Sequence, residues 1–460
     1  MFTDRRRAMK TITKGKMWCF AIGQFGWSLL SALITNWLVY FYQPDADSIA
    51  AGQTLFIPQG RVIFGVATVI GGIAALGRVF DAVTDPMIAN LSDRSQNPKG
   101  RRIPFMQKIA IPFAVITALV FWAPVNAVSG VNCIWLLVTL LLFYLFMTTY
   151  CTPYNALISE LGTTQDTRIS ISTYISVTFL LGSAIGYAAP FIWGALEPSM
   201  GRVTAIRITF AILSAIGLIA LLVPTFTINE KEYVHTVPSN DDAFTSLIKT
   251  FKNHDFRIFV GSDVLYFLGL TIFQTGLPFF ITSLMKLPET FTTILYVAMT
   301  LLSFACYMPV NALAHRMNKK KLVLIGFTGL AAVYLITAVS GLMGGSGLVF
   351  GIIIVCAAAF PMAILGILPQ AIVADIAEAD AVVTGENREG MFFAARTFAF
   401  KFGQSIAMLV FTAFASIGTE TGLGYRIAAV SAAVICLAGA LILSRYNEEK
   451  ILGIIVPDKK

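Results

Sequence analysis

The chain has 460 residues, of which 57% are hydrophobic and only 13% charged, and its mean hydropathy is +0.76. Soluble domains are ~150 residues long and carry about 25% charged residues. This chain therefore has too few charged residues to form the surfaces of several soluble domains. The composition excludes a soluble multidomain enzyme, a disordered protein, a collagen and a disulfide scaffold. The net charge of +8 lies in short basic runs between apolar segments, which indicates a membrane surface rather than nucleic acid as the partner.

About twelve apolar runs are long enough to cross a bilayer, since a helical span needs about 20 residues. The runs are continuous, unlike the alternating strands of a membrane barrel, so we expect an all-α membrane protein. The predicted spans are 17–42, 62–90, 106–125, 132–158, 171–195, 205–227, 258–284, 290–313, 322–344, 347–373, 391–417 and 422–444. A polar segment separates them into a six-helix bundle at 1–228, a cytoplasmic loop at 229–256 and a second six-helix bundle at 257–460.

Lysine and arginine predict the orientation of these spans. They gather before the first span, after the second and after the eighth, whereas the loops at 43–60 and 121–131 hold none. Because basic loops stay in the cytoplasm, we expect a cell (inner or plasma) membrane protein with both termini cytoplasmic. The polar and basic turn at 89–94 recurs at 311–316. Parallel repeats of six spans around a central site are typical of transporters.

The second predicted span carries charges inside the hydrocarbon. Asp81 and Asp85 are spaced i, i+4 on one helix face, and Arg78 precedes them. With Thr84 and a carbonyl freed by Pro86, these carboxylates form a hard-oxygen site that suits Na⁺ or a proton. Two alternatives are structural: Asp81 neutralises Arg78, or Asp85 caps a neighbouring helix. An aspartyl protease is disfavoured, because both acids lie on one helix.

Lys401 lies among phenylalanines in the eleventh predicted span and therefore needs a partner. We expect that partner to be Asp81 or Asp85, which would couple ion binding to the rocking of the two halves. We expect Asp263 to lie at the membrane–water interface, near the cytoplasmic end of the seventh span. We expect Asp375 to form a salt bridge with the basic turns, and this salt bridge would lock the inner face of the protein. In the first span, Trp27 and neighbouring polar side chains suit a polyhydroxylated ligand, because rings stack on sugars and amides bind hydroxyls.

The pattern Arg78-x-x-Asp81-x-x-x-Asp85-Pro86 resembles the glycoside–pentoside–hexuronide:cation symporters, the relatives of melibiose permease within the major facilitator superfamily. Further matching motifs are Ser92-Asp93-Arg94, Gly100-Arg101-Arg102-x-Pro104, Val373-Ala374-Asp375, Thr384-Gly385, Arg388-Glu389-Gly390, Phe398, Lys401 and Gly403. The resemblance implies a major facilitator fold with twelve transmembrane helices in two six-helix bundles. It also implies symport of sugars with Na⁺, Li⁺ or H⁺ by alternating access.

The resemblance extends to the site. It implies that Asp81 and Asp85 bind the coupling cation, as a metal site if that cation is Na⁺, with Thr148 and Thr84 nearby. The family's sugar-binding carboxylates fall on neutral residues here, so a galactoside is not expected. Arg396 beside Thr397 would accept an acidic sugar. The predicted solute residues are Gln24, Trp27, Ser28, Cys151, Asn155, Arg396, Thr397 and Lys401, and the predicted coupling or gate residues are Arg78, Asp93, Arg94, Asp375, Arg388 and Lys401.

We therefore expect a secondary active transporter that moves a sugar, glycoside or sugar acid with Na⁺ or H⁺, with no catalytic residue and no cofactor besides that ion. The expected partners are a small solute and the lipid bilayer, without nucleic acid, and the expected state is a monomer. One alternative keeps the fold and carries a lysolipid or another organic solute. Another is an uncoupled uniporter. A membrane enzyme or sensor would need a nucleophile, a metal set or a long signalling domain, none of which the sequence shows.

Overall fold

A computed structural model describes residues 12–63, 65, 67–93, 95–162, 165–233, 248–314, 316–342, 346–385 and 389–455. Over these residues the chain forms helices joined by short loops, with one isolated β-bridge between Ile63 and Ala67. The predicted all-α class is confirmed. The helices are α1 (Lys14–Tyr42), α2 (Ala46–Ala50), α3 (Val69–Asp93), α4 (Ile103–Val120), α5 (Gly130–Leu161), α6 (Gln165–Tyr187), α7 (Ala189–Met200), α8 (Arg202–Thr227), α9 (Glu230–Tyr233), α11 (His254–Phe279), the π-helix η1 (Phe280–Leu284), α12 (Thr290–Ala305), α13 (Tyr307–Ala314), α14 (Lys319–Val339), α15 (Gly347–Thr384), α16 (Glu389–Ala415), α17 (Leu423–Leu443) and α18 (Glu448–Ile455).

Eleven segments of the described chain are long and apolar enough to cross a membrane. The remaining predicted span is the second in chain order and corresponds to α3, which has 25 residues but is too highly charged to meet the same standard of apolarity. Its charges at Arg78, Asp81, Asp85 and Asp93 are among those that the sequence marks as functional. The helix that departs from a plain membrane span is therefore the one predicted to hold the ion.

Several predicted spans differ from the helices that form. The eighth consists of α12 and α13, which are separated at Cys306, and the tenth continues as α15 to Thr384 rather than ending at residue 373. The second begins at Val69 rather than at residue 62, because Gly60 and Gly65 adopt positive φ angles of 82° and 69° in the preceding loop. The fifth consists of α6 and α7, which are interrupted at Ala188 just before Pro190. Proline is favoured in the first turn of a helix, because the N–H group that it lacks would have no partner within the helix there.

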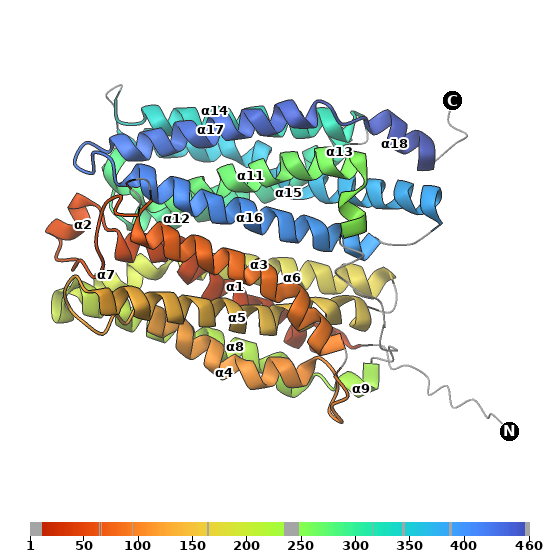
Figure 1. Ribbon diagram of the computed structural model, residues 1–460, viewed down its shortest axis with the longest axis horizontal. Helices are drawn as coiled ribbons and strands as arrows, with labels where there is room; N and C mark the ends of the chain where they lie inside the picture. Colours follow the sequence, from red (N-terminus) through yellow and green to blue (C-terminus); the bar gives the residue numbers. More distant parts are fainter. Residues whose placement is uncertain are drawn as a thin grey trace. The chain divides into compact units, whose positions relative to one another are not determined.

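The helices group into two compact units, and each is described by itself. The first unit comprises Met1–Leu38, Val83–Val125 and Val131–Asp241. Within it α4 packs along α8 (Figure 1). Helix α6 approaches α1 through small residues: a Cβ on Gly182 would lie 2.1 Å from Ser28 Oγ, and Trp37 Nε1 donates to the Gly186 carbonyl at 2.9 Å. Close helix contacts through glycine are typical of membrane bundles.

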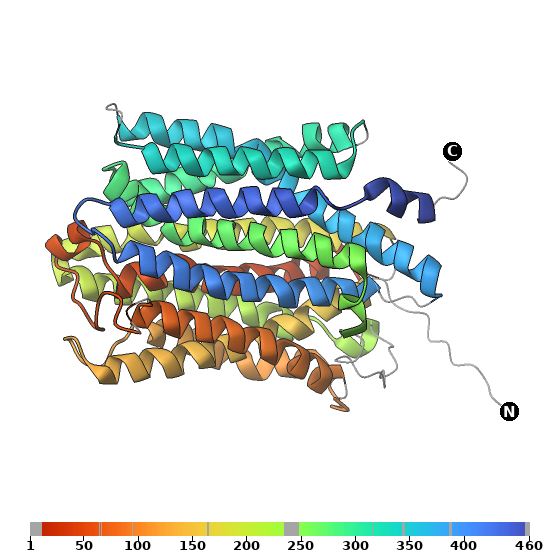
Figure 2. The same ribbon diagram turned by 45° about the horizontal axis from the view of Figure 1, so that its top comes forward.

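The second unit comprises Val39–Ala82, Asn126–Gly130 and Asp242–Lys460. Within it α11 lies between α16 and α17 (Figure 2), and α14 runs beside α17. Asp45, which caps α2, connects the segment Val39–Ala82 to these helices. It is 1% exposed and accepts hydrogen bonds from Thr282 and Ser283 of η1 at 2.9 and 2.8 Å.

The boundaries of the units follow packing rather than chain order. Helix α1 passes from the first unit to the second after Leu38, and α3 passes from the second to the first after Ala82. The six-and-six division with a loop at 229–256 describes order along the chain, and it stays a prediction.

Candidate functional site

The two predicted cation ligands lie one helical turn apart on α3, which continues unbroken through Pro86. Asp81 is fully buried, whereas Asp85 is half-buried. A charged carboxylate inside a membrane bundle is costly unless it is paired, so the partners of these two groups decide what they do.

Asp81 is paired with Lys401. The Nζ atom of Lys401 lies 2.9 Å from Asp81 Oδ2, and the exposed fractions of the two side chains are 12% and 0%. The lysine expected to need a buried carboxylate thus has one, and both residues belong to the second unit. The pair removes the net charge of the buried acid, while an arriving cation would compete with the ammonium for the same oxygens.

Asp85 has a neutral partner in the first unit. Thr148 Oγ1 of α5 donates to Asp85 Oδ1 at 3.1 Å, and Thr148 is 1% exposed. Thr84 is also buried. A carboxylate with a hydroxyl beside it offers hard oxygen ligands, as the sequence predicted for this position. Arg78 is 8% exposed on the same helix.

Arg396 forms the second buried ion pair of α16. Its Nε and Nη2 atoms donate to the two carboxylate oxygens of Asp263 at 2.7 and 2.9 Å. Asp263 is 3% exposed and packs against α16, so it is buried within the protein, while its expected place near the cytoplasmic membrane interface stays a prediction. Its position nine residues into the long apolar α11 was the available signal. The proposed role of Arg396 toward a solute stays a prediction, but its guanidinium is already bound to a carboxylate.

The other predicted solute residues have different surroundings. Gln24 and Ser28 are buried on α1, and Ser28 packs against Gly182 while its hydroxyl donates to the Phe25 carbonyl at 3.1 Å. Ser28 therefore serves helix packing in this structure. Trp27 is half-buried beside Phe179, and its buried Nε1 has no hydrogen-bond acceptor among the described residues.

The remaining candidates are more open. Cys151 is half-buried and Asn155 is exposed, both on α5. Thr397 is half-buried, and its hydroxyl donates to the Phe393 carbonyl within α16 at 3.0 Å. None of these contacts tests a role in solute binding, which stays a prediction for all three.

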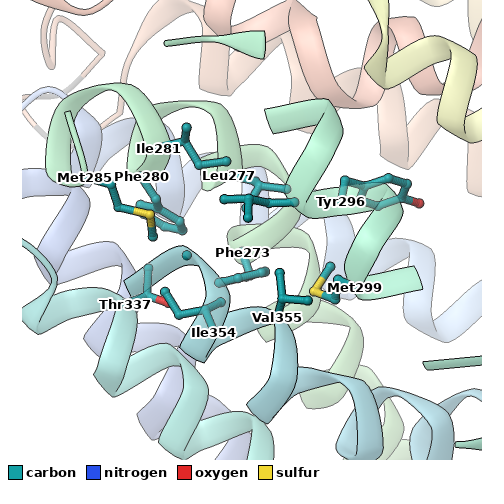
Figure 3. Close-up of a pocket in the computed structure, with 12 residues that line it drawn as sticks. Phe273, Leu277, Phe280, Ile281, Met285, Tyr296, Met299, Thr337, Ile354 and Val355 are labelled. Carbon is teal, nitrogen blue, oxygen red and sulfur yellow. The ribbon is translucent and has the colours of Figure 1, made fainter. Parts of the chain in front are cut away.

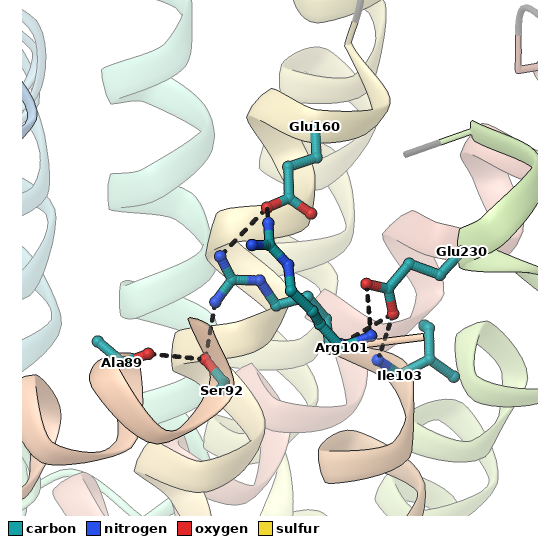
Figure 4. A network of polar contacts seen from close by, with 7 residues as sticks. Ala89, Ser92, Arg101, Ile103, Glu160 and Glu230 are labelled. Atoms are coloured by element: carbon teal, nitrogen blue, oxygen red, sulfur yellow. Dashed lines mark hydrogen bonds and ion pairs between the residues drawn. The ribbon is translucent and has the colours of Figure 1, made fainter. Parts of the chain in front are cut away.

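A network that the sequence analysis did not predict joins the basic turn before α4 to two acids (Figure 4). Glu160 Oε1 accepts from Arg101 at 2.6 Å and from Arg102 at 3.1 Å, and Arg102 also donates to Ser92 Oγ at 2.7 Å. Glu230 accepts from the backbone N–H groups at residues 101, 102 and 103 at 2.8, 2.8 and 3.1 Å. Glu230 thus caps the start of α4.

The second unit repeats this arrangement. Glu448 accepts from the backbone N–H groups of Lys319 and Lys320, both at 2.9 Å, and Lys319 Nζ contacts Asp375 at 2.5 Å. The contacts Arg101–Glu230 and Lys319–Glu448 each span 129 residues, as two equivalent repeats would produce. Equal spacing of acids and basic turns was the missed signal. Asp375 therefore has the expected basic partner, and its role in gating stays a prediction.

Three predicted coupling residues are not described at the side-chain level. Arg94 and Arg388 lie outside the described residues, and so does the side chain of Asp93. Their roles stay predictions.

Two cavities are described in the second unit, and none of the predicted solute residues is among the residues that line them. One is an apolar space of about 10 Å³ between Phe273, Leu277 and Val355 (Figure 3). Its volume is at the lower limit for one water molecule, so it is too small for a solute. Another, of about 320 Å³, is lined by Tyr40, Asp45, Asp47, Ser48, Thr282, Lys286, Leu287, Pro288 and Glu289.

Comparison with known proteins identifies the family to which this chain belongs. The model of the family described as MFS/sugar transport protein matches residues 19–450. The chain belongs to this family. The motif on α3 and the stretch around Lys401 thus occur in the family context that the sequence suggested.

Similar proteins include symporters for two kinds of solute. The chain is 25% identical to the inner membrane symporter YicJ of Escherichia coli over 51% of this chain and 50% of that protein, and 24% identical to the isoprimeverose transporter of Lactiplantibacillus pentosus over 55% and 49%. The match thus spans only about half the length of these two relatives. The chain is also 25% identical to the sodium-dependent lysophosphatidylcholine symporter 1 of Xenopus tropicalis over 73% of this chain and 70% of that protein.

Solved structures support the fold. A mutant of the nucleoside transporter NupG superposes with a TM-score of 0.66 at 12% identity, covering 95% of this chain and all of that one. A D-xylose–proton symporter superposes with a TM-score of 0.64 at 14% identity, covering 94% and 97%. The major facilitator fold is therefore confirmed. The family and these neighbours are membrane transporters rather than enzymes, in agreement with the expectation from the sequence.

Proposed function

We propose that this protein is a secondary active transporter that carries a sugar or glycoside together with Na⁺ or H⁺ by alternating access. The observation on which the proposal depends is the pairing of α3. Within the second unit α3 presents Asp81 to Lys401, and one turn later, within the first unit, it presents Asp85 to Thr148. A cation that binds these acids therefore acts on a helix that belongs to both compact units.

Lys401 supplies a physical basis for coupling. Without an ion, its ammonium neutralises Asp81 and keeps a buried carboxylate tolerable. A cation bound at the acids competes with Lys401, so the free energy of ion binding is linked to the arrangement of α16. An ion can shift the equilibrium between two carrier states only by its difference in affinity for them. A coupling site must therefore change its ligands between states, as a lysine-occupied site does.

The solute class rests on the relatives. The isoprimeverose transporter and the putative glycoside/cation symporter YagG of Escherichia coli, which is 24% identical over 75% of this chain, favour a sugar or glycoside. Trp27 supports this solute, since its half-buried ring beside Phe179 provides an aromatic face on which a sugar ring can stack. We further propose a monomer in the cell membrane, with both termini in the cytoplasm.

A second candidate solute is a lysolipid. It is favoured by the match to lysophosphatidylcholine symporters, which covers 73% of this chain for the Xenopus protein. In that case the same cation site would drive an amphipathic solute.

The proposal is tested by uptake of radiolabelled sugars, glycosides and lysolipids into proteoliposomes under an imposed Na⁺ or H⁺ gradient. We expect gradient-driven accumulation of a sugar or glycoside and its loss in Asp85→Asn. Thr148→Val removes one hydrogen bond to a carboxylate, about 1.5 kcal/mol, and should weaken the apparent ion affinity roughly tenfold.

The matched control is Thr149→Val, because Thr149 lies next to Thr148 on α5 and its hydroxyl donates to the Leu145 carbonyl of the same helix at 2.7 Å. Its ion dependence should match that of the wild type. Accumulation that persists in Asp85→Asn would contradict the coupling, and accumulation of lysolipid alone would favour the second candidate.

A further inference from the structure

The second unit holds two cations on α16, and each is bound to a buried carboxylate. Arg396 makes a two-point contact with Asp263 at 2.7 and 2.9 Å, and Lys401 contacts Asp81 at 2.9 Å. The side chains of Arg396 and Asp263 are 9% and 2% exposed. Because a two-point guanidinium–carboxylate contact neutralises both groups, Arg396 presents no net positive charge to a solute.

The Asp263–Arg396 pair is part of a patch that also contains two aromatic rings. Phe267 follows Asp263 by one turn on α11, and Phe400 follows Arg396 by one turn on α16. The two rings are stacked, with centroids 4.2 Å apart and planes at 23°, and the Arg396 guanidinium lies 5.7 Å from the Phe267 centroid. Both rings are half-buried rather than sealed.

The patch adjoins the ion pair of the candidate site. Lys401 follows Phe400 directly along α16, so the aromatic pair lies beside the residue that binds Asp81. All of these residues belong to the second unit. Asp263, Phe267, Arg396 and Phe400 thus form one contiguous patch between α11 and α16, and Lys401 is the next residue along α16.

We infer that the patch formed by Asp263, Phe267, Arg396 and Phe400 receives an uncharged, polyhydroxylated ring, and that Asp263 makes the carrier reject sugars that bear a carboxylate. This inference rests on the proposed function and specifies its solute. The rings provide an apolar surface for a sugar face, while the charge pair offers N–H donors and carboxylate acceptors to hydroxyls.

A sugar acid meets a specific obstacle at this patch. Its carboxylate must approach Asp263, and the two like charges repel in a medium of low dielectric constant. To bind Arg396 it must also displace Asp263, which would leave a buried carboxylate without its partner. Asp263 therefore acts as the residue that sets specificity, and Arg396 acts as the group that it masks.

The test uses matched neutral and acidic sugars: methyl glucoside with methyl glucuronide, and methyl galactoside with methyl galacturonide. Uptake is measured in proteoliposomes of the full chain under the driving ion gradient. The wild type should transport the neutral member at least tenfold faster than the acid. Asp263→Asn frees Arg396 and should raise the acid-to-neutral ratio about tenfold. Adding Arg396→Gln should return the ratio to the wild-type value.

Competition on the wild type provides a second measurement that does not depend on the folding of a variant. Neutral sugar uptake should be inhibited by unlabelled neutral sugar and at least tenfold less by the matched acid. Equal inhibition or equal uptake of the acid overturns the inference, and so does an unchanged ratio in a monodisperse Asp263→Asn protein. A carrier that accumulates no sugar in response to either gradient overturns the proposed function as well, so the two failures are distinguishable.

Discussion

The two acids of α3 have different electrostatic surroundings. Asp81 is fully buried and bound to an ammonium, whereas Asp85 is half-buried and bound to a hydroxyl. An ion that binds Asp81 must compete with the Lys401 ammonium for the carboxylate oxygens. The pair Asp81–Lys401 should therefore contribute to stability as well as to coupling.

This contribution can be measured with Lys401→Met. The substitution removes the ammonium that pairs with the fully buried Asp81, so the free energy of unfolding should fall by about 3–5 kcal/mol. The double variant with Asp81→Asn should regain most of that loss, because no uncompensated charge remains. Thermal unfolding of the purified protein in detergent gives both values.

Lys450→Met provides the control for charge removal. Lys450 is 53% exposed and pairs with Asp255 at 2.8 Å, and exposed pairs contribute about 0–1 kcal/mol. A Lys401→Met protein as stable as Lys450→Met would show that the Asp81–Lys401 pair contributes little to stability.

At the scale of elements, the first backbone N–H groups of two helices each donate to a buried glutamate that is distant in the sequence. Glu230 and Glu448 are 3% and 5% exposed, and they accept backbone N–H groups at the starts of α4 and α14. The first N–H groups of a helix have no partner within the helix, and its N-terminus favours negative charge. Each acid thus anchors a membrane helix to the segment that follows the last long helix of its unit.

We expect Glu230→Gln and Glu448→Gln each to lower the free energy of unfolding by about 1–3 kcal/mol, because a charged acceptor is lost from several buried donors. Hydrogen exchange should accelerate at the first amides of α4 in the former variant and of α14 in the latter. Glu449→Gln, which changes an exposed neighbour of Glu448, should alter stability by less than about 0.5 kcal/mol. Exchange that rises equally along the whole chain would argue against local capping.

At the scale of the whole molecule, the distribution of Lys and Arg predicts both termini in the cytoplasm. A green fluorescent protein fused to the C-terminus should fluoresce in cells, and alkaline phosphatase fused there should be inactive. Alkaline phosphatase inserted at 126–130, a loop without Lys or Arg, should be active. The reverse pattern of activities would invert the predicted orientation.

Much of this protein could be predicted from local composition. Helices such as α8 and α12 begin or end close to the predicted limits, because 20 or more apolar residues permit little besides a membrane helix. Asp81, Asp85 and Lys401 could also be identified from the sequence, because a charged side chain within an apolar run carries a large free-energy cost in a membrane. The break between α6 and α7 and the late start of α3 were missed, because proline and glycine act through the local backbone rather than through hydropathy.

The sequence by itself determined the membrane class, the helical spans, the family and the acids and lysine of the candidate ion site. Only the tertiary structure decided the partners: Lys401 with Asp81, Asp85 with Thr148, Arg396 with Asp263, and the two glutamates with their helix starts. The reason is physical. Hydropathy is a property of each segment and can be summed along the chain, whereas a contact between distant side chains depends on how each helix is rotated and how far it slides against its neighbours.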